Sequence, residues 1–225
     1  NMERMFYDSK AFKQTLPDEW KKKAGYTSKY IKNQPQVKNQ LQQWLIEYHT
    51  NGDRSTLEPP NLWDVSLITN MNRLFSKDGL YDFNENISNW NVSNVTNMKQ
   101  MFRSSKAFNQ PIDKWNVSNV TNMAYMFSYS EAFNQPIEKW DVSNVTSMEW
   151  MFSYSKAFNQ PIEKWDVSNV TNMEQMFRES KAFNQPIDKW DVSNVTNMKM
   201  MFNGSKAFKQ TLPDEWKKKA GYQQD

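Results

Sequence analysis

The sequence contains no cysteine and a single histidine, His49, in 225 residues. The lack of cysteine excludes disulfides, thiol nucleophiles and zinc–thiolate sites, and it gives no information on the redox compartment. No set of a nucleophile, a base and an orienting group can be assembled, so we predict that the chain is not an enzyme and has no catalytic, cofactor or metal site. No stretch approaches 18 consecutive apolar residues, so no transmembrane segment is expected.

Strong charge of one sign is also missing. The chain has 28 Lys and Arg against 25 Asp and Glu, a formal net charge of +3. This balance is too weak and too mixed to favour a nucleic-acid partner. Aromatic residues, in contrast, make up 15% of the chain, and most of them fall at regular intervals.

A unit of 25 residues repeats along the chain, with a looser copy of 27 residues before it and a copy with a different ending after it. Copies begin at Trp63, Trp90, Trp115, Trp140, Trp165 and Trp190. A fixed period between about 20 and 50 residues is typical of a solenoid, which grows along one axis and has no single central core.

The apolar positions of one unit predict its backbone. The β-branched run at residues 120–123 predicts a short strand, and Met123, Met126 and Phe127 at i, i+3 and i+4 predict one α or 3-10 turn. An extended return follows the turn signal before Pro136. Stacked at about 4.8 Å, such coils form a parallel ladder with buried Trp, Phe and Met columns. We interpret the Met column as core packing rather than a copper or haem site.

The residue after each repeat Trp is Asn or Asp, as at Asn116 and Asp141. This exchange indicates a shared acceptor role, such as capping a turn, with calcium binding as the weaker alternative.

Segments outside the repeat predict caps at both ends of residues 63–210. Residues 27–62 contain an amphipathic helix at about 34–50, which we assign as the N-terminal cap. Its apolar face is predicted to comprise Val37, Leu41, Trp44, Leu45 and Tyr48. Pro59 and Pro60 are expected to prevent further helix. Residues 211–225 are assigned as a C-terminal cap helix and tail, with acidic residues in the first turn and Gly221 at the end.

Residues 1–26 repeat residues 197–222 with four differences, at an offset of 196 residues. We interpret them as a half-repeat and C-terminal cap of a preceding array, within a longer polypeptide of tandem arrays. A half-repeat must bury its apolar face on other coils, within this chain or on another. The predicted array-joining residues are Met2, Met5, Phe6, Phe12, Leu16 and Trp20.

The repeat motif resembles a known family. The run Trp-Asp-Val-Ser-Asn-Val-Thr-Asn-Met-x-x-Met-Phe, followed by Ala-Phe-Asn-Gln-Pro-Ile-x-x-Trp, occurs at residues 165–177 and 182–190. It resembles the repeat of BspA-like, leucine-rich-repeat-related bacterial surface proteins and lipoproteins, although those repeats include versions with cysteine. The resemblance implies a right-handed leucine-rich-repeat-type solenoid, display outside the cell, adhesion or interaction roles and no enzyme activity.

Four positions in each unit vary from copy to copy: the two between the Met residues and the two after Met-Phe. We expect them to face outward and to bring four aromatic side chains together on adjacent coils. The candidate interaction patch comprises Tyr125, Tyr129, Trp150, Tyr154, Arg103 and Arg178. Clustered exposed aromatics are typical of interaction hot spots.

Two functions follow from these patterns. The favoured one is an extracellular structural protein, one link of a fibre whose arrays join head to tail or laterally with copies of themselves. Its basis is the near-duplication at an offset of 196 residues. The alternative is an adhesion module that uses the patch to bind a protein or a glycan.

Overall fold

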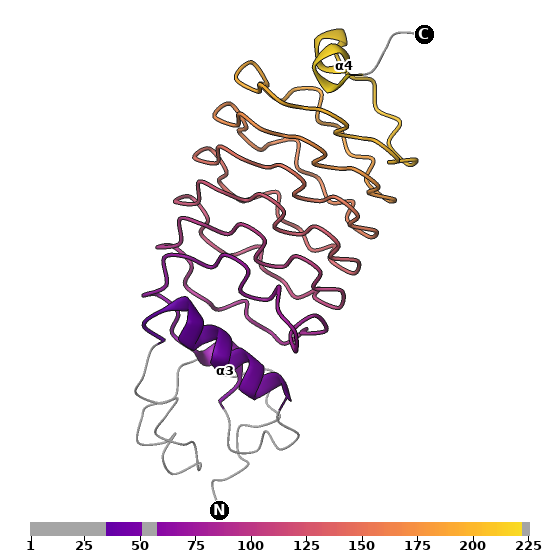
Figure 1. The fold of residues 1–225 in the computed structure, drawn as a ribbon. Helices are drawn as coiled ribbons and strands as arrows, with labels where there is room; N and C mark the ends of the chain where they lie inside the picture. The colour runs from indigo at the N-terminus through magenta and orange to yellow at the C-terminus, as the bar shows by residue number, and fades with distance from the viewer. Residues whose placement is uncertain (1–34, 51–57, 222–225) are drawn as a thin grey trace, which may run out of the picture.

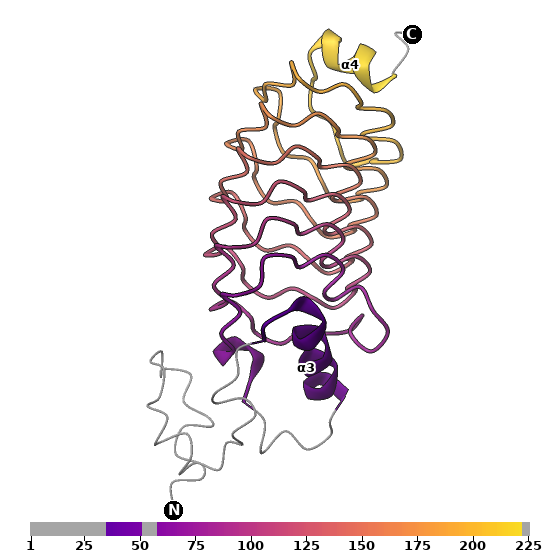
Figure 2. The ribbon, with the colours of Figure 1, turned by 60° about the vertical axis from the view of Figure 1, so that its left-hand side comes forward.

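The computed structural model describes residues 35–50 and 58–221. Its helices are α3 (Lys38–Thr50), the 3-10 helix η1 (Pro60–Leu62) and α4 (Asp214–Ala220). Between α3 and α4 the chain winds into coils that stack along one axis, with one helix at each end (Figures 1 and 2). The segment proposed to join arrays, residues 1–26, lies outside the described residues.

Successive coils are linked by single parallel β-bridges rather than by strands. The bridges run through one equivalent position per coil: Asn70, Asn97, Asn122, Ser147, Asn172 and Asn197. The short strand predicted at residues 120–123 is therefore wrong in extent, because only Asn122 pairs with its neighbours on both sides. Hydrogen bonds such as that from the N–H of Thr121 to the carbonyl of Thr96 (2.9 Å) extend the contact between coils.

The helical turn predicted at Met123 to Phe127 is also wrong, since these residues form a run of β-turns. Alternate N–H groups close turns within the coil, as from Met126 to Met123 (3.1 Å). The N–H groups between them bond to the next coil, as from Phe127 to Met151 (2.9 Å). A helix directs all its N–H groups along its own axis, so it could not provide these bonds between coils.

Aromatic columns form the core. Trp90 and Trp115 lie 6.4 Å apart with an interplanar angle of 1°. Within one coil Phe152 and Phe158 lie 4.0 Å apart, and Phe158 lies 6.1 Å from Phe183 of the next coil. Burial of such rings contributes on the order of 2–3 kcal/mol each before the loss of conformational entropy is counted.

Side-chain amides connect the coils at the turn before proline. The side-chain oxygen of Asn134 accepts hydrogen bonds from the backbone N–H of Asn159 (3.0 Å) and the amide of Gln160 (3.0 Å). The Asp column has a turn-capping role, since Oδ1 of Asp141 accepts from the N–H and the hydroxyl of Ser143 (3.1 and 2.6 Å). The columns of buried rings and of amides therefore set the register between coils.

Helix α3 covers the first coil. Leu41, Trp44, Leu45 and Tyr48 are buried, as the periodicity predicted. The helix begins at Lys38, four residues later than predicted. Val37 therefore precedes the helix and is 59% exposed, so the prediction that it belongs to the apolar face was wrong. Gln42, in contrast, is buried and donates to the carbonyls of Arg73 (3.0 Å) and Leu74 (2.7 Å), which satisfies acceptors at the edge of the first coil.

Helix α4 covers part of the last coil. Leu212, Trp216 and Ala220 are buried on one face, and Trp216 lies 6.4 Å from Trp190. Gly221 ends the helix with φ 78°, a left-handed conformation that favours glycine. Before the coils, Pro60 begins η1, contrary to the expectation of no further helix, because proline is tolerated in the first turn.

Candidate interaction site

The aromatic patch occupies positions where the backbone is left-handed. Tyr125, Tyr129, Trp150 and Tyr154 have φ between 57° and 60°. Positive φ is uncommon for residues other than glycine and is unfavourable for bulky side chains. The N–H group of each of these residues bonds to the next coil, at 2.7–2.9 Å. The ladder of hydrogen bonds therefore holds the backbone under all four side chains in a fixed conformation.

The structure brings the aromatic residues together in two parallel pairs. Tyr125 and Trp150 stack with ring centroids 5.6 Å apart and an interplanar angle of 11°. Tyr129 and Tyr154 stack at 4.5 Å and 5°. Each pair joins two adjacent coils, so the four rings form a block with little freedom to reorient. Such pairs contribute about 0.5–1.5 kcal/mol beyond the burial of their area.

Arg178 joins the two pairs from the following coil. Its guanidinium carbon lies 5.6 Å from the centroid of Trp150 and 5.7 Å from that of Tyr154. Its Nη1 donates to the side-chain oxygen of Gln175 (2.6 Å). Cation–π contacts and this hydrogen bond fix the planar guanidinium between the rings. Arg103 lies on the coil before the aromatic residues, three coils from Arg178.

Burial corrects the expectation that all four variable positions face solvent. Ala124, Ser128 and Ser153 have no exposed area, and Gln100 and Gln175 are 7% exposed. The longer side chains on the same face extend further from the backbone and shield these residues from solvent. Of the four aromatic residues of the patch, Tyr129 is the most exposed, at 39%, and the other three are half-buried.

The sequence pattern did not indicate that Ser128 and Ser153 lie beneath the patch. Oγ of Ser153 donates to the carbonyl of Arg178 (3.2 Å). Oγ of Ser128 is buried and has no hydrogen-bond partner among the described residues. The sequence offered one signal of this burial: in their column, two small serines stand between the large Arg103 and Arg178 of the adjacent coils.

Charges beside the patch are mixed. Burial raises the pKa of Tyr125 above its ordinary value, and the nearby carboxylates of Glu149 and Glu174 add to that effect. Both carboxylates have amide partners, from Asn172 to Glu149 (2.7 Å) and from Asn197 to Glu174 (3.0 Å).

A row of exposed side chains, mostly lysines, follows the patch two residues further along each coil. The row reads Lys106, Glu131, Lys156, Lys181 and Lys206. Lys156 contacts Glu131 of the preceding coil at 2.7 Å. Four of the five side chains in the row are therefore positive, and two of them, Lys156 and Lys181, are paired with carboxylates.

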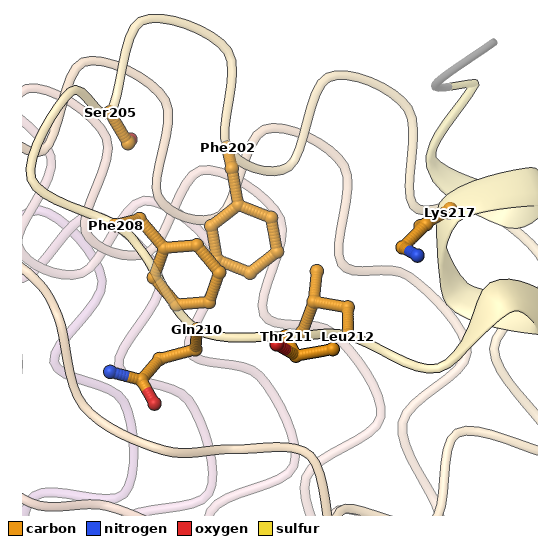
Figure 3. Close-up of a pocket in the computed structure, with 7 residues that line it drawn as sticks. All are labelled: Phe202, Ser205, Phe208, Gln210, Thr211, Leu212 and Lys217. Atoms are coloured by element: carbon orange, nitrogen blue, oxygen red, sulfur yellow. The ribbon is translucent and has the colours of Figure 1, made fainter. Parts of the chain in front are cut away.

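A second feature lies at the C-terminal end of the stack. A cavity of about 520 Å³ is lined by Phe202, Ser205, Phe208, Gln210, Thr211, Leu212 and Lys217. Figure 3 shows the Phe202 and Phe208 rings side by side, with Leu212 next to them and Lys217 reaching over from α4. These two rings lie 4.1 Å apart. Helix α4 covers the Trp column but leaves this end of the Phe columns accessible.

The described residues contain neither a membrane-spanning helix nor a cluster of metal ligands. No helix in residues 35–50 and 58–221 is long and apolar enough to cross a membrane. The same residues include no group of three or more His, Asp or Glu side chains placed to hold a metal ion.

Comparison with known families gives one match. The family described as "Mycoplasma protein of unknown function, DUF285" matches residues 1–44, 45–156 and 131–223. No curated protein and no solved structure matches the chain.

Proposed function

The chain belongs to the DUF285 family, and we propose that it is a non-enzymatic module that binds another protein through the aromatic patch. The observation that carries this proposal is the rigid block of two stacked ring pairs with a guanidinium between them. Tyr, Trp and Arg dominate the energetics of protein interfaces, because Tyr and Trp bury large areas with few rotatable bonds and Arg offers a planar group with several hydrogen-bond donors.

Backbone conformation supports a role in recognition over a role in stability. Glycine fits the column of Tyr129 and Tyr154, because Gly204 occupies it in the last coil with φ 73°. A bulky residue at such a position costs roughly 1 kcal/mol relative to glycine. Strained positions that keep large side chains are typical of binding sites.

The arrangement of the rings favours a protein over a glycan. A sugar ring needs an open aromatic face on which to stack. Tyr129 and Tyr154 cover one face of each other, and Trp150 lies between Tyr125 and Arg178 in coil order. The side chains therefore offer edges and polar groups, which suit the mixed contacts of a protein interface.

We further propose that the stack is a leucine-rich-repeat-type solenoid of the BspA-like kind, displayed outside the cell. The repeat motif and the coil-by-coil ladder support this assignment. An interaction module on a surface protein also agrees with the adhesion roles that the resemblance implies.

The test uses substitutions that the array itself supplies at equivalent positions. In the quadruple variant Tyr125→Gln, Trp150→Gln, Tyr129→Ser and Tyr154→Ser, each residue is replaced by one that the array carries in the same column, at Gln100, Gln175 or Ser104. A random 12-residue peptide library displayed on phage is selected against the wild-type chain, and the enriched peptides are assayed on both proteins. We expect peptides that bind the wild type at least tenfold more tightly than the variant. Enriched peptides that bind both proteins equally would remove the patch from the proposal.

End-to-end joining of arrays is the second candidate, because the cavity leaves the last Phe pair accessible at one end. At the other end α3 already covers the first coil, so coils could stack there only if α3 were displaced. Electron microscopy of the chain at high concentration tests this function. Filaments with a regular repeat of about one array would support it, and single particles alone would argue against it.

A further inference from the structure

We propose that the ligand of the patch is an extended acidic peptide segment of a partner protein, which runs along the stack axis with two carboxylate side chains, four residues apart, bound by Arg103 and Arg178. This inference rests on the proposed function and specifies the chemistry of its partner. The observations that carry it are the spacing of the arginines, their hydrogen-bonding capacity and the charges around them.

The spacing of the two arginines matches an extended chain. They lie 75 residues apart in the sequence, which is three coils of 25 residues. At about 4.8 Å per coil the separation along the axis is about 14 Å. An extended peptide rises about 3.4 Å per residue, so side chains i and i+4 lie about 14 Å apart and point to the same face.

The residue midway between the two carboxylates, at i+2, would then lie over the third and fourth coils. There it would rest on the side chains that cover Ser128 and Ser153, next to the two ring pairs. An apolar side chain suits this place, because aromatic rings lie beside it. The predicted recognition pattern is therefore acidic-x-apolar-x-acidic.

Both arginines have donors to spare. A guanidinium carries five N–H donors, and the described contacts of Arg178 use one, to Gln175. Nε of Arg103 and Nε of Arg178 are buried with no hydrogen-bond partner among the described residues, so the donors within reach of a ligand are those at the Nη end of each guanidinium group. A carboxylate can accept two parallel hydrogen bonds from such a group, which gives the strongest type of charge-assisted pair.

Each acidic side chain near the patch has a partner other than these arginines. Glu149 and Glu174 accept from asparagine amides. Glu131 is paired with Lys156 and Glu179 with Lys181. These ion pairs neutralise Lys156 and Lys181, so the positive charge that an acidic chain would meet at the patch comes from the two guanidinium groups.

The experiment measures binding of synthetic nine-residue peptides to the full chain by fluorescence anisotropy. The reference peptide carries Glu at positions 3 and 7, Val at position 5 and Thr or Ser elsewhere. One control moves the second Glu to position 6, and another replaces both Glu residues by Gln. The protein variants are Arg103→Ser and Arg178→Ser, which use the residue of the same column in the third and fourth coils, and Asn203→Ser in the last coil is the matched control.

We expect each arginine substitution and each peptide control to weaken binding about tenfold or more, which corresponds to about 1.4 kcal/mol, and the Asn203 variant to bind as the wild type. Equal binding of the shifted peptide would overturn the proposed spacing, and equal binding of the Gln peptide would overturn the carboxylate recognition. The peptide selection separates this inference from the function beneath it. If patch-dependent peptides lack a pair of acidic residues, the inference fails and the protein-binding function stands. If no peptide depends on the patch, both fail.

Discussion

The stacking of phenylalanines predicts that the same substitution has different effects in the middle and at the end of the array. Phe158 is fully buried and lies 4.0 Å from Phe152 and 6.1 Å from both Phe133 and Phe183. Phe158→Ala removes a ring from a closed core, so we expect a loss of about 3–5 kcal/mol in the free energy of unfolding. The loss combines the lost burial of the ring with the cost of an enclosed void.

Phe208 provides the matched case. It occupies the same column, is half-buried, and lies at the wall of the C-terminal cavity. Its ring contacts are with Phe202 at 4.1 Å and Phe183 at 6.0 Å. Phe208→Ala enlarges a space that is already open, so no closed void forms and only part of the ring's transfer free energy is lost. We expect about 1–2 kcal/mol.

Urea titration monitored by tryptophan fluorescence and far-UV circular dichroism measures both values. The surface substitution Lys156→Ala serves as a control and should stay within about 0.5 kcal/mol of the wild type. If the dependence of the free energy of unfolding on urea concentration has the same slope in all variants, the shift in the urea midpoint multiplied by that slope gives the change in stability. Equal losses for Phe158→Ala and Phe208→Ala would refute the reasoning, because they would show that ring contacts between coils do not determine the stability of the array.

Three further predictions concern the polar contacts and the backbone. Asn134→Ala removes the acceptor for Asn159 and Gln160, so it should cost about 1–3 kcal/mol by urea titration, and Asn134→Asp should cost less because it keeps an acceptor. Ser104→Gly should stabilise the chain by up to about 1 kcal/mol, since Ser104 has φ 64°; a loss of stability there would contradict the proposed strain. The hydrogen bond from His49 holds the pKa of Asp82 below its ordinary value, so its contribution to the docking of α3 is present above the ordinary pKa and is lost as the pH falls through the lowered pKa. After correction for the intrinsic exchange rate, the protection of the α3 amides against hydrogen exchange should therefore fall below about pH 4 in the wild type, and Asp82→Asn should remove that change.

The sequence could predict the periodic part of the fold because one unit repeats the same chemistry. Trp, Phe and Met at constant spacing must all be buried or all be exposed, and rings of this size are buried. The Asn before proline likewise pointed to contacts between coils. In these cases the position of one residue in one coil determined the environment of its equivalents.

Local periodicity misled where contacts between coils decide the backbone. Met123, Met126 and Phe127 show helical spacing, yet the segment is a run of turns with left-handed residues. The N–H groups that a helix would use internally bond to the next coil instead. No pattern within one unit contains this information, because the partner lies 24 residues further along the chain, as from Tyr125 to Glu149.

The left-handed columns also explain why recognition and stability are separable in this array. The N–H group at each such position must point along the stack, and the side chain then projects away from the core. Any residue other than glycine costs free energy there, but none of them disturbs the packing of Trp, Phe and Met beneath. Glycine stands at this column in the last coil, at Gly204, whereas aromatic rings stand at it in two coils of the middle. Large side chains on the least favourable backbone do not contribute to the stability of the array, but they suit a binding surface. The hydrogen bonds that impose the left-handed backbone also restrict the motion of the rings, and this restriction lowers the entropy lost on binding.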